Sequence, residues 1–563
     1  MLDGGDFRER YEGDDPLRSA LVPWWRAGRD GGPLRVEDDP GAAGERWLVT
    51  APGQVASQPF AAYLPLAGGL RIEGRVRGRG VVTIVDGSGA RAEFPVGADS
   101  EAFTIEGREL TAQLGHATTP RLEIQLASAG EGLARWTDVR ALVPLPCPPE
   151  SELRAEVVRR LDEIVATWLE RGLDPRTAFI AHLHDAVTGA KLVPLGGGVF
   201  PLWTGLLEAL RHEDRPEWRG PFEAFVESYL ERSFAPATGL PARWDFDAHA
   251  PELDGFVEVH ADLRFLLDLA EHGPARFRAR ALERARRIGE AVLERGVAPD
   301  GNVVAAYRPR DGAISLRPPL RRLDVPAQLA RLGKATGDER FVVAVRNALA
   351  VFEYTHLWQC SWNHIDPGFD DDFGTYGARA VTMLASYPDE TAFRALVASG
   401  YAYYVPRWRD ALRFGGTVAA DQVRCWRLLL EYAALEPGVA AEVRALVPRA
   451  ARAHLKGEQY ANGAFGDVTF ANFDPQTGLE VGDLPGTPSN LLEGLALVHD
   501  AALDVDLDEV RALYTAVLRS TVEHYRRPYG YLMTERERAD RNLAAGGLRL
   551  LSGLVDMLAR LGG

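Results

Sequence analysis

Apolar side chains recur at two different periods along the chain, and the change of period divides the chain into two regions. In residues 68–96, 120–127 and 134–146, apolar and polar positions alternate, with Gly, Asp and Pro between the runs. Alternation at period 2 is typical of strands that bury one face. We therefore predict an antiparallel β-sandwich over residues 20–145, preceded by an N-terminal tail over residues 1–19.

From residue 151 onward the apolar period is 3.6, which is typical of amphipathic helices. A proline-rich linker, residues 144–150, comes between the two regions. The helices follow in pairs, an apolar one after a polar loop and then a more charged one. The pattern of the apolar member occurs in residues 201–210, 258–273, 323–337, 373–387, 419–435, 489–503 and 542–558.

Pairs of this kind build either an open solenoid or a closed ring. The apolar segments are unevenly spaced and share no consensus, which disfavours a solenoid. We therefore predict a mainly α fold, an (α/α) toroid over residues 151–563, with the N-termini of its inner helices around one end of a central cleft. Residues 182–194, 305–318 and 471–483 each place a turn between short extended runs, and we predict β-hairpins there at the rim.

A β-sandwich followed by a ring of helical pairs resembles the (α/α)6-toroid carbohydrate-active enzymes, which include glycoside hydrolases, polysaccharide lyases and sugar epimerases. Trp24, Trp25 and the segment 136–139 also resemble the jelly-roll, carbohydrate-binding modules attached to such enzymes, although packing in the core is the simpler explanation. The resemblance implies a catalytic toroid that acts on a poly- or oligosaccharide. It carries over no catalytic residue, because the chain contains no motif that is diagnostic of one family.

Composition disfavours several other partners. The chain has 563 residues with 64 basic and 80 acidic side chains, and its net charge of -16 disfavours nucleic acid and anionic membranes. It has no apolar run of about 18 residues, and its three cysteines are too far apart for a zinc motif or a disulfide framework. We expect no cofactor, and we make no prediction about the oligomeric state. The chain starts without the basic and apolar segments of a secretory signal, so we expect a cytoplasmic location, or secretion if a signal was removed.

Glycoside hydrolysis needs two carboxyl groups, one protonated and one ionised, across the scissile bond. Many toroid hydrolases invert the anomeric centre, so the resemblance implies an inverting mechanism. A carboxylate at a helix N-terminus is held ionised and suits a base, whereas apolar or aromatic neighbours raise the pKa of an acid. The candidates are therefore Asp and Glu residues beside aromatic residues at the starts of the apolar helices.

The densest candidate is the segment 362–380, where Asp370, Asp371 and Asp372 immediately precede an apolar helix. One carboxylate could cap that helix, but three adjacent ones repel each other and call for a further reason. A solvated acidic turn, a catalytic or substrate-binding role, and a structural Ca²⁺ site are the alternatives, although the spacing is not that of an EF-hand loop. The residues beside the aspartates are Trp362, Asn363, His364 and Tyr376.

The second candidate is Glu258 with His260, at the start of another apolar helix, where Glu258 and Asp262 would share one face at i, i+4. A cap and a satisfied histidine are the structural alternative. Our hypothesis is that Glu258 and one of Asp370–Asp372 form the acid/base pair. The further catalytic candidates are His260, His364 and Tyr376. The substrate-binding candidates are Trp203, Trp244, Asp324, Trp362, Asn363, Asp421, Tyr460 and Asp467, of which Asp324 can also be read as an N-cap.

Three other classes stay open. A polysaccharide lyase would cleave a uronic-acid-containing glycan by β-elimination, using a tyrosine or histidine as base, and an epimerase would use histidines. A non-catalytic glycan-binding protein would need only the aromatic and polar groups of a cleft.

Overall fold

The structure is a computed structural model of the chain. It describes residues 25–27, 34–39, 41–42, 45–61, 70–86, 89–97, 100–114, 121–142, 147–182, 184–185, 190–196, 199–298, 301, 303–315, 323–354, 377–413, 422–455, 488–500, 502–503, 505–525, 542–543 and 549–561.

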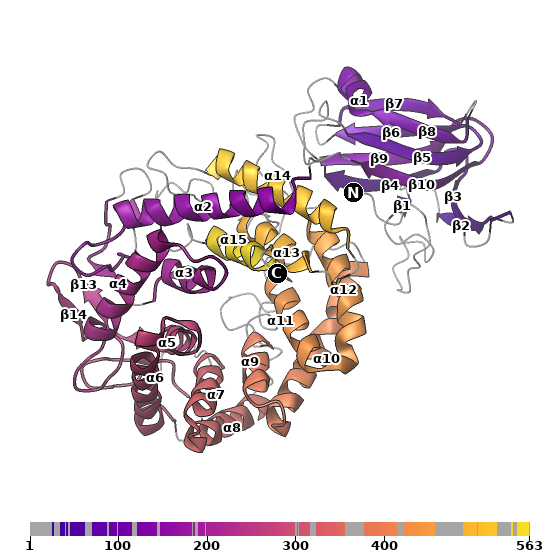
Figure 1. The fold of residues 1–563 in the computed structure, drawn as a ribbon. Coiled ribbons are helices and arrows are strands. Elements are labelled where there is room, and N and C mark those ends of the chain that lie inside the picture. The colour runs from indigo at the N-terminus through magenta and orange to yellow at the C-terminus, as the bar shows by residue number, and fades with distance from the viewer. Residues whose placement is uncertain are drawn as a thin grey trace.

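The N-terminal region contains two five-stranded antiparallel sheets (Figure 1). The strand orders are β1-β4-β9-β6-β7 and β2-β3-β10-β5-β8. Side chains along β5 are buried at every second position, as the alternating sequence pattern predicts. The strands are β1 Arg26–Ala27, β2 Arg35–Asp38, β3 Arg46–Thr50, β4 Val55–Ala61, β5 Arg71–Arg77, β6 Gly80–Asp86, β7 Arg91–Val96, β8 Ala102–Glu106, β9 Arg121–Ser128 and β10 Ala134–Leu142, and helix α1, Gly107–Leu114, follows β8.

Both sheets contribute side chains to one hydrophobic core, in which Trp25 and Trp136 are fully buried. The indole N–H of Trp136 donates a hydrogen bond to Oγ1 of Thr50 at 2.9 Å, so its one polar atom is satisfied inside the core. Neither ring offers a face to a sugar. Packing therefore explains both tryptophans, while Trp24 lies outside the described residues.

The C-terminal region is helical, and its described helices form seven pairs. Helices α3 and α4 begin with proline, which loses no hydrogen bond at a first helical position, and α7 ends at Gly337, whose φ of 70° suits a left-handed cap. No described helix is both long and apolar enough to cross a bilayer. The helices are α2 Glu150–Arg171, α3 Pro201–His212, α4 Pro216–Arg232, α5 His260–His272, α6 Ala275–Arg295, α7 Asp324–Thr336, α8 Glu339–Tyr354, α9 Ala378–Ser386, α10 Thr391–Arg413, α11 Gln422–Leu435, α12 Pro437–Leu455, α13 Pro488–Val498, α14 Leu507–Tyr525 and α15 Arg549–Arg560.

The pairs close into a ring. Each inner helix packs on the next, from α3 through α5, α7, α9, α11 and α13 to α15, and α15 packs back on α3. Figure 1 shows the ring viewed along its axis. These helices lie on the inside, and the helices on the outside are α2, α4, α6, α8, α10, α12 and α14. The seven apolar segments of the sequence coincide with the seven inner helices. The predicted ring of helical pairs is confirmed, and its described part holds one pair more than the six that the resemblance implies.

The two ends of the ring differ in the length of their connections. An inner helix passes to the next outer helix through short segments such as 213–215 and 273–274. An outer helix passes to the next inner helix through long segments such as 172–200 and 233–259. The long segments therefore gather where the inner helices begin, and we call this the loop end of the ring.

Short strands tie neighbouring long segments together at the loop end. Bridges between His184 and Lys191 and between Tyr307 and Ile314 close turns inside 182–194 and 305–318, which confirms two of the three predicted hairpins. The third, 471–483, lies outside the described residues. The paired strands are β11 His184–Asp185 with β17 Asn542–Leu543, β12 Leu195–Gly196 with β13 Arg243–Asp245, β13 with β14 Ala250–Glu252, and β15 Val257–Glu258 with β16 Ala306–Tyr307.

Candidate functional site

Glu258 and His260 lie together at the loop end of the ring. Glu258 belongs to β15, and pairing with β16 sets it opposite Ala306, while the N–H of Val259 donates to the Ala305 carbonyl at 3.0 Å. Oε2 of Glu258 lies 3.6 Å from Nδ1 of His260. The Glu258 side chain is 40% exposed. The strand pairing thus holds an accessible carboxylate beside an imidazole, directly before α5.

Asp262 does not share these surroundings, so the predicted common face with Glu258 is wrong. An i, i+4 relationship needs both residues on one helix, but α5 begins at His260 and Glu258 is in a strand. Asp262 is buried, and its Oδ1 accepts a hydrogen bond from the Tyr229 hydroxyl of α4 at 2.5 Å. Burial raises the pKa of the Asp262 carboxyl to about 6. Strand pairing, rather than a helix, positions Glu258.

Asp324 is also not the N-cap that its sequence context suggests. Helix α7 begins at Asp324 itself, after Leu323, and no side chain makes a cap hydrogen bond there. The Asp324 carboxylate is buried and accepts a hydrogen bond from Nε of Arg379, at the start of α9, at 2.5 Å. This contact joins two neighbouring inner helices. A role for Asp324 in substrate binding stays a prediction.

Trp203 and Trp244 are buried, which contradicts the prediction that they bind substrate. Trp203 is fully buried and stacks on Phe225 of α4, with ring centroids 4.4 Å apart and nearly parallel planes. Trp244 is 6% exposed and packs against Phe179, with centroids 5.7 Å apart. Stacking on a sugar needs an exposed ring face, and both rings use their faces within the core.

The remaining predicted residues lie outside the described part of the chain. They are Trp362, Asn363, His364, Asp370, Asp371, Asp372, Tyr376, Asp421, Tyr460 and Asp467. Their catalytic and binding roles, and the alternative Ca²⁺ site, stay predictions. Within the described ranges, no group of three or more His, Cys, Asp or Glu side chains is arranged to hold a metal ion.

The inner helices α5, α7, α9, α11, α13 and α15 carry polar residues on an otherwise buried surface. In α5 a stripe of them runs through Arg264, Asp268 and Glu271, whereas Leu263 and Phe265, on either side of Arg264, are fully buried. The spacing of three or four residues keeps the stripe on one face of the helix. The corresponding residues elsewhere are Gln328 and Arg331 in α7, Arg379 and Thr382 in α9, Arg427 and Glu431 in α11, Glu493 in α13, and Ser552 and Asp556 in α15.

These polar stripes face the axis of the ring. Their charged side chains form ion pairs from one inner helix to another and also affect charges on inner helices that are not neighbours. Nη2 of Arg331 in α7 lies 2.8 Å from Asp268 in α5. Nη2 of Arg427 in α11 lies 2.9 Å from Glu493 in α13 and also pairs with Asp556 in α15. The stripes therefore line the space that the inner helices enclose, which we call the lumen. None of these residues was predicted as a site residue, although single charges at helical spacing inside apolar segments would have indicated them.

Arg264 shows that solvent reaches the lumen. Its side chain is 62% exposed, yet the surrounding protein lowers the pKa of its guanidinium through desolvation. Arg264 is thus open to water while other protein groups lie around it. The positive charges of Arg331, Arg379 and Arg427 lower the pKa of Arg264 further, and two of these three come from helices that do not adjoin α5 in the ring. We call Arg264, Arg331, Arg379 and Arg427 the lumen arginines.

Glu431 shares this space. Its side chain is exposed, but the surrounding protein raises the pKa of its carboxyl, against the opposing effect of Arg427 and Arg264. It makes no hydrogen bond or ion pair with a described residue. The lumen thus contains a carboxyl group that takes up a proton more readily than an ordinary glutamate and is close to two guanidinium groups.

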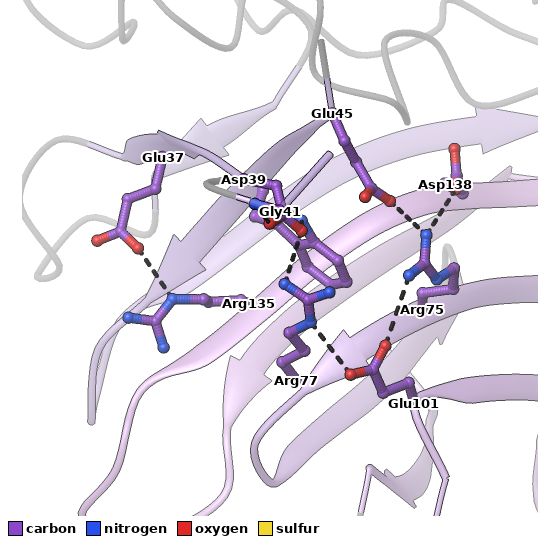
Figure 2. A network of polar contacts seen from close by, with 10 residues as sticks. Glu37, Asp39, Gly41, Glu45, Arg75, Arg77, Glu101, Arg135 and Asp138 are labelled. Atoms are coloured by element: carbon purple, nitrogen blue, oxygen red, sulfur yellow. Dashed lines mark hydrogen bonds and ion pairs between the residues drawn. The ribbon is translucent and has the colours of Figure 1, made fainter. Parts of the chain in front are cut away.

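The N-terminal sheets present a different polar surface, on the face of β3 and β5 that points away from their core (Figure 2). Arg77 pairs with Asp39 at 2.7 Å and with Glu101 at 3.1 Å, and its guanidinium lies 4.2 Å from the centroid of the Trp47 ring. Trp47 is 2% exposed and donates to Asp39 at 3.1 Å. The N–H of Gly41 and the Arg77 side chain lower the pKa of Asp39. Arg77 thus covers the Trp47 ring, which has no open face for a sugar.

No protein-family model matches the chain, and no curated protein matches it. Among solved structures it is similar to an α-1,2-mannosidase from Trichoderma reesei, with 10% sequence identity over 73% of this chain and 94% of that chain, at a TM-score of 0.49. D-mannose isomerase has 11% identity over 72% of this chain and 97% of that chain, at 0.44. Cellobiose 2-epimerase from Spirochaeta thermophila DSM 6192 has 14% sequence identity over 73% of this chain and 97% of that chain, at a TM-score of 0.43. These are carbohydrate-active enzymes, and at such identities no residue role is carried over from them.

Proposed function

We propose that the protein is a carbohydrate-active enzyme, a glycoside hydrolase that binds a poly- or oligosaccharide at the loop end of the ring. The observation that carries the proposal is the accessible Glu258 carboxylate, held by strand pairing beside His260 at the end where the long segments gather. The lumen is open to solvent and contains carboxyl groups and arginines. These groups suit a ligand rich in hydroxyl groups, because the carboxylates accept and the guanidinium groups donate several hydrogen bonds at once.

Glu258 and one of Asp370–Asp372 are the proposed acid/base pair. The aspartates directly precede the region of α9, and α5 and α9 are both neighbours of α7 in the ring. A carboxyl pair on two segments of the loop end could flank a glycosidic bond, with one member protonated and the other ionised. An inverting outcome follows if the two groups are far enough apart to admit a water molecule between the sugar and the base.

The test is hydrolysis of a panel of oligosaccharides by the full-length protein. We expect Glu258→Gln to lower kcat by roughly 10²–10⁴-fold while the protein stays folded, because Gln keeps the shape of Glu but can neither donate nor accept the proton. The matched control is Glu294→Gln, at an exposed position on outer helix α6. Wild-type turnover in Glu258→Gln and in all three single Asp→Asn variants of 370–372 would rule out this pair.

A polysaccharide lyase is the second candidate, and the lumen arginines favour it, because β-elimination needs the carboxylate of a uronic acid to be countered by positive charge. The two reactions differ in their products. A lyase gives an unsaturated sugar with a new ultraviolet absorbance, whereas a hydrolase gives a reducing end without it. Binding of a glycan with neither product would instead indicate a non-catalytic glycan-binding protein.

A further inference from the structure

The lumen arginines come from four successive inner helices, α5, α7, α9 and α11, and their ion pairs are unequal. Arg331 lies 2.8 Å from Asp268, and Arg379 lies 2.5 Å from Asp324. Arg427 pairs with two carboxylates, one of them at 2.9 Å. These three guanidinium groups are therefore neutralised by close partners on the helices themselves.

Arg264 differs from the other three. Its one ion pair within the described residues is to Asp268 at 3.7 Å, and Asp268 already holds Arg331 at the shorter distance. A separation of 3.7 Å is too long for a hydrogen bond, so the donors of Arg264 stay unsatisfied by this carboxylate. Its side chain is 62% exposed, against 19% for Arg331, 23% for Arg379 and 35% for Arg427. Arg264 is thus the lumen arginine that is open to a ligand.

Charged groups of both signs act on Arg264. The charged groups with the largest effect on the pKa of Arg264 include three guanidinium groups and one carboxylate, that of Asp268. The other three guanidinium groups are held by carboxylates, so the positive charge without a hydrogen-bonded carboxylate among the described residues is that of Arg264. An anion placed at Arg264 would meet a planar, bidentate donor.

We propose that Arg264 binds an anionic substituent of the sugar, a carboxylate or a phosphate, inside the lumen. The sugar part of this inference rests on the proposed function, whereas the anion site does not. Glu431 adjoins the same space and, where it carries a proton, donates a hydrogen bond to the anion instead of repelling it. The enzyme would then select charged sugars over their neutral counterparts.

The experiment is titration calorimetry on the full-length protein with pairs of probes that differ in one anionic group. Methyl β-glucuronide is compared with methyl β-glucoside, and glucose 6-phosphate with glucose, while inorganic phosphate tests the anion without a sugar. We expect one charged sugar to bind at least about tenfold more tightly than its neutral twin, and Arg264→Gln to abolish that preference. The matched control is Arg276→Gln, on outer helix α6, where the side chain is 61% exposed and pairs with Glu223 at 2.7 Å.

The outcomes separate the two proposals. A preference for the glucuronide identifies a carboxylate, and a preference for the sugar phosphate identifies a phosphate ester. Equal binding of charged and neutral sugars, or a preference that survives Arg264→Gln, overturns the anion site and leaves the proposed function standing. Arg264-dependent binding of inorganic phosphate without binding of any sugar supports the anion site and contradicts the proposed function. Binding of none of the three anionic probes, the glucuronide, glucose 6-phosphate and inorganic phosphate, overturns the anion site.

Discussion

Asp262 and Arg264 are two residues apart on α5, and the structure gives their charges opposite surroundings. Residues two apart on a helix point to nearly opposite sides. Asp262 therefore faces α4, where it accepts the Tyr229 hydroxyl hydrogen bond, and Arg264 faces the lumen. The buried carboxyl has a raised pKa because burial disfavours its charged form. One residue supports the packing of a helical pair, and the other is free to meet a ligand.

The Asp262 carboxyl predicts a pH dependence of stability. Its pKa is raised from 3.8 to about 6, so the folded state favours the protonated carboxyl. The stabilisation of the folded state by this protonated carboxyl is fully present below the unfolded pKa and is lost as the pH rises through about 6. Asp262→Asn removes this ionisation and keeps an oxygen for Tyr229. The free energy of unfolding of the Asp262→Asn variant, minus that of the wild type, should therefore increase by about 1–3 kcal/mol between about pH 4 and about pH 8. Denaturant titrations at several pH values measure this, and parallel curves for the two proteins would refute it.

At the scale of elements, the sequence predicts what depends on local pattern and misses what depends on pairing at a distance. All seven inner helices follow from apolar spacing, because each buries one wide face. The strand that holds Glu258 could not be read in the same way, since β15 pairs with β16 about fifty residues later. The Trp203 and Trp244 rings are likewise hidden by partners from other elements. An aromatic residue in a loop or first turn does not reveal which way it faces.

The contact between α13 and α15 depends on a glycine and can be tested directly. A Cβ on Gly553 would lie 2.9 Å from the backbone nitrogen of Glu493 and 2.9 Å from Cβ of Leu492. Gly553→Ala should therefore push the two helices apart and lower the free energy of unfolding by about 1–3 kcal/mol. At Gly220 in α4 no described atom lies within 4 Å of such a Cβ, so Gly220→Ala should stabilise by about 0.5–1 kcal/mol. Equal effects of the two changes in denaturant unfolding would contradict the close packing.

At the scale of the molecule, closure of the ring creates the candidate site. The lumen arginines are spread from residue 264 to residue 427, and the carboxylates that hold Arg427 lie as far on as residue 556. Nothing in the local sequence indicates that these groups meet, because their proximity arises only when the inner helices pack side by side in the ring. Glu258 could be identified from the sequence as a catalytic candidate, because it stands directly before an apolar helix. The lumen residues could have been suspected from their spacing, but their mutual approach could not.

The two regions also have separate hydrophobic cores, since the clusters of buried residues in the sheets and in the ring share no member. We therefore expect two unfolding transitions in calorimetry. Gly80→Ala would place a Cβ 2.3 Å from the Trp136 ring and should lower only the transition of the sheets, by about 4–8 °C for each kcal/mol lost in a region of about 100 residues. Gly553→Ala should lower only the transition of the ring. A single transition that both substitutions lower together would mean that the cores unfold as one, and the proline-rich segment before α2 would then not separate two independent units.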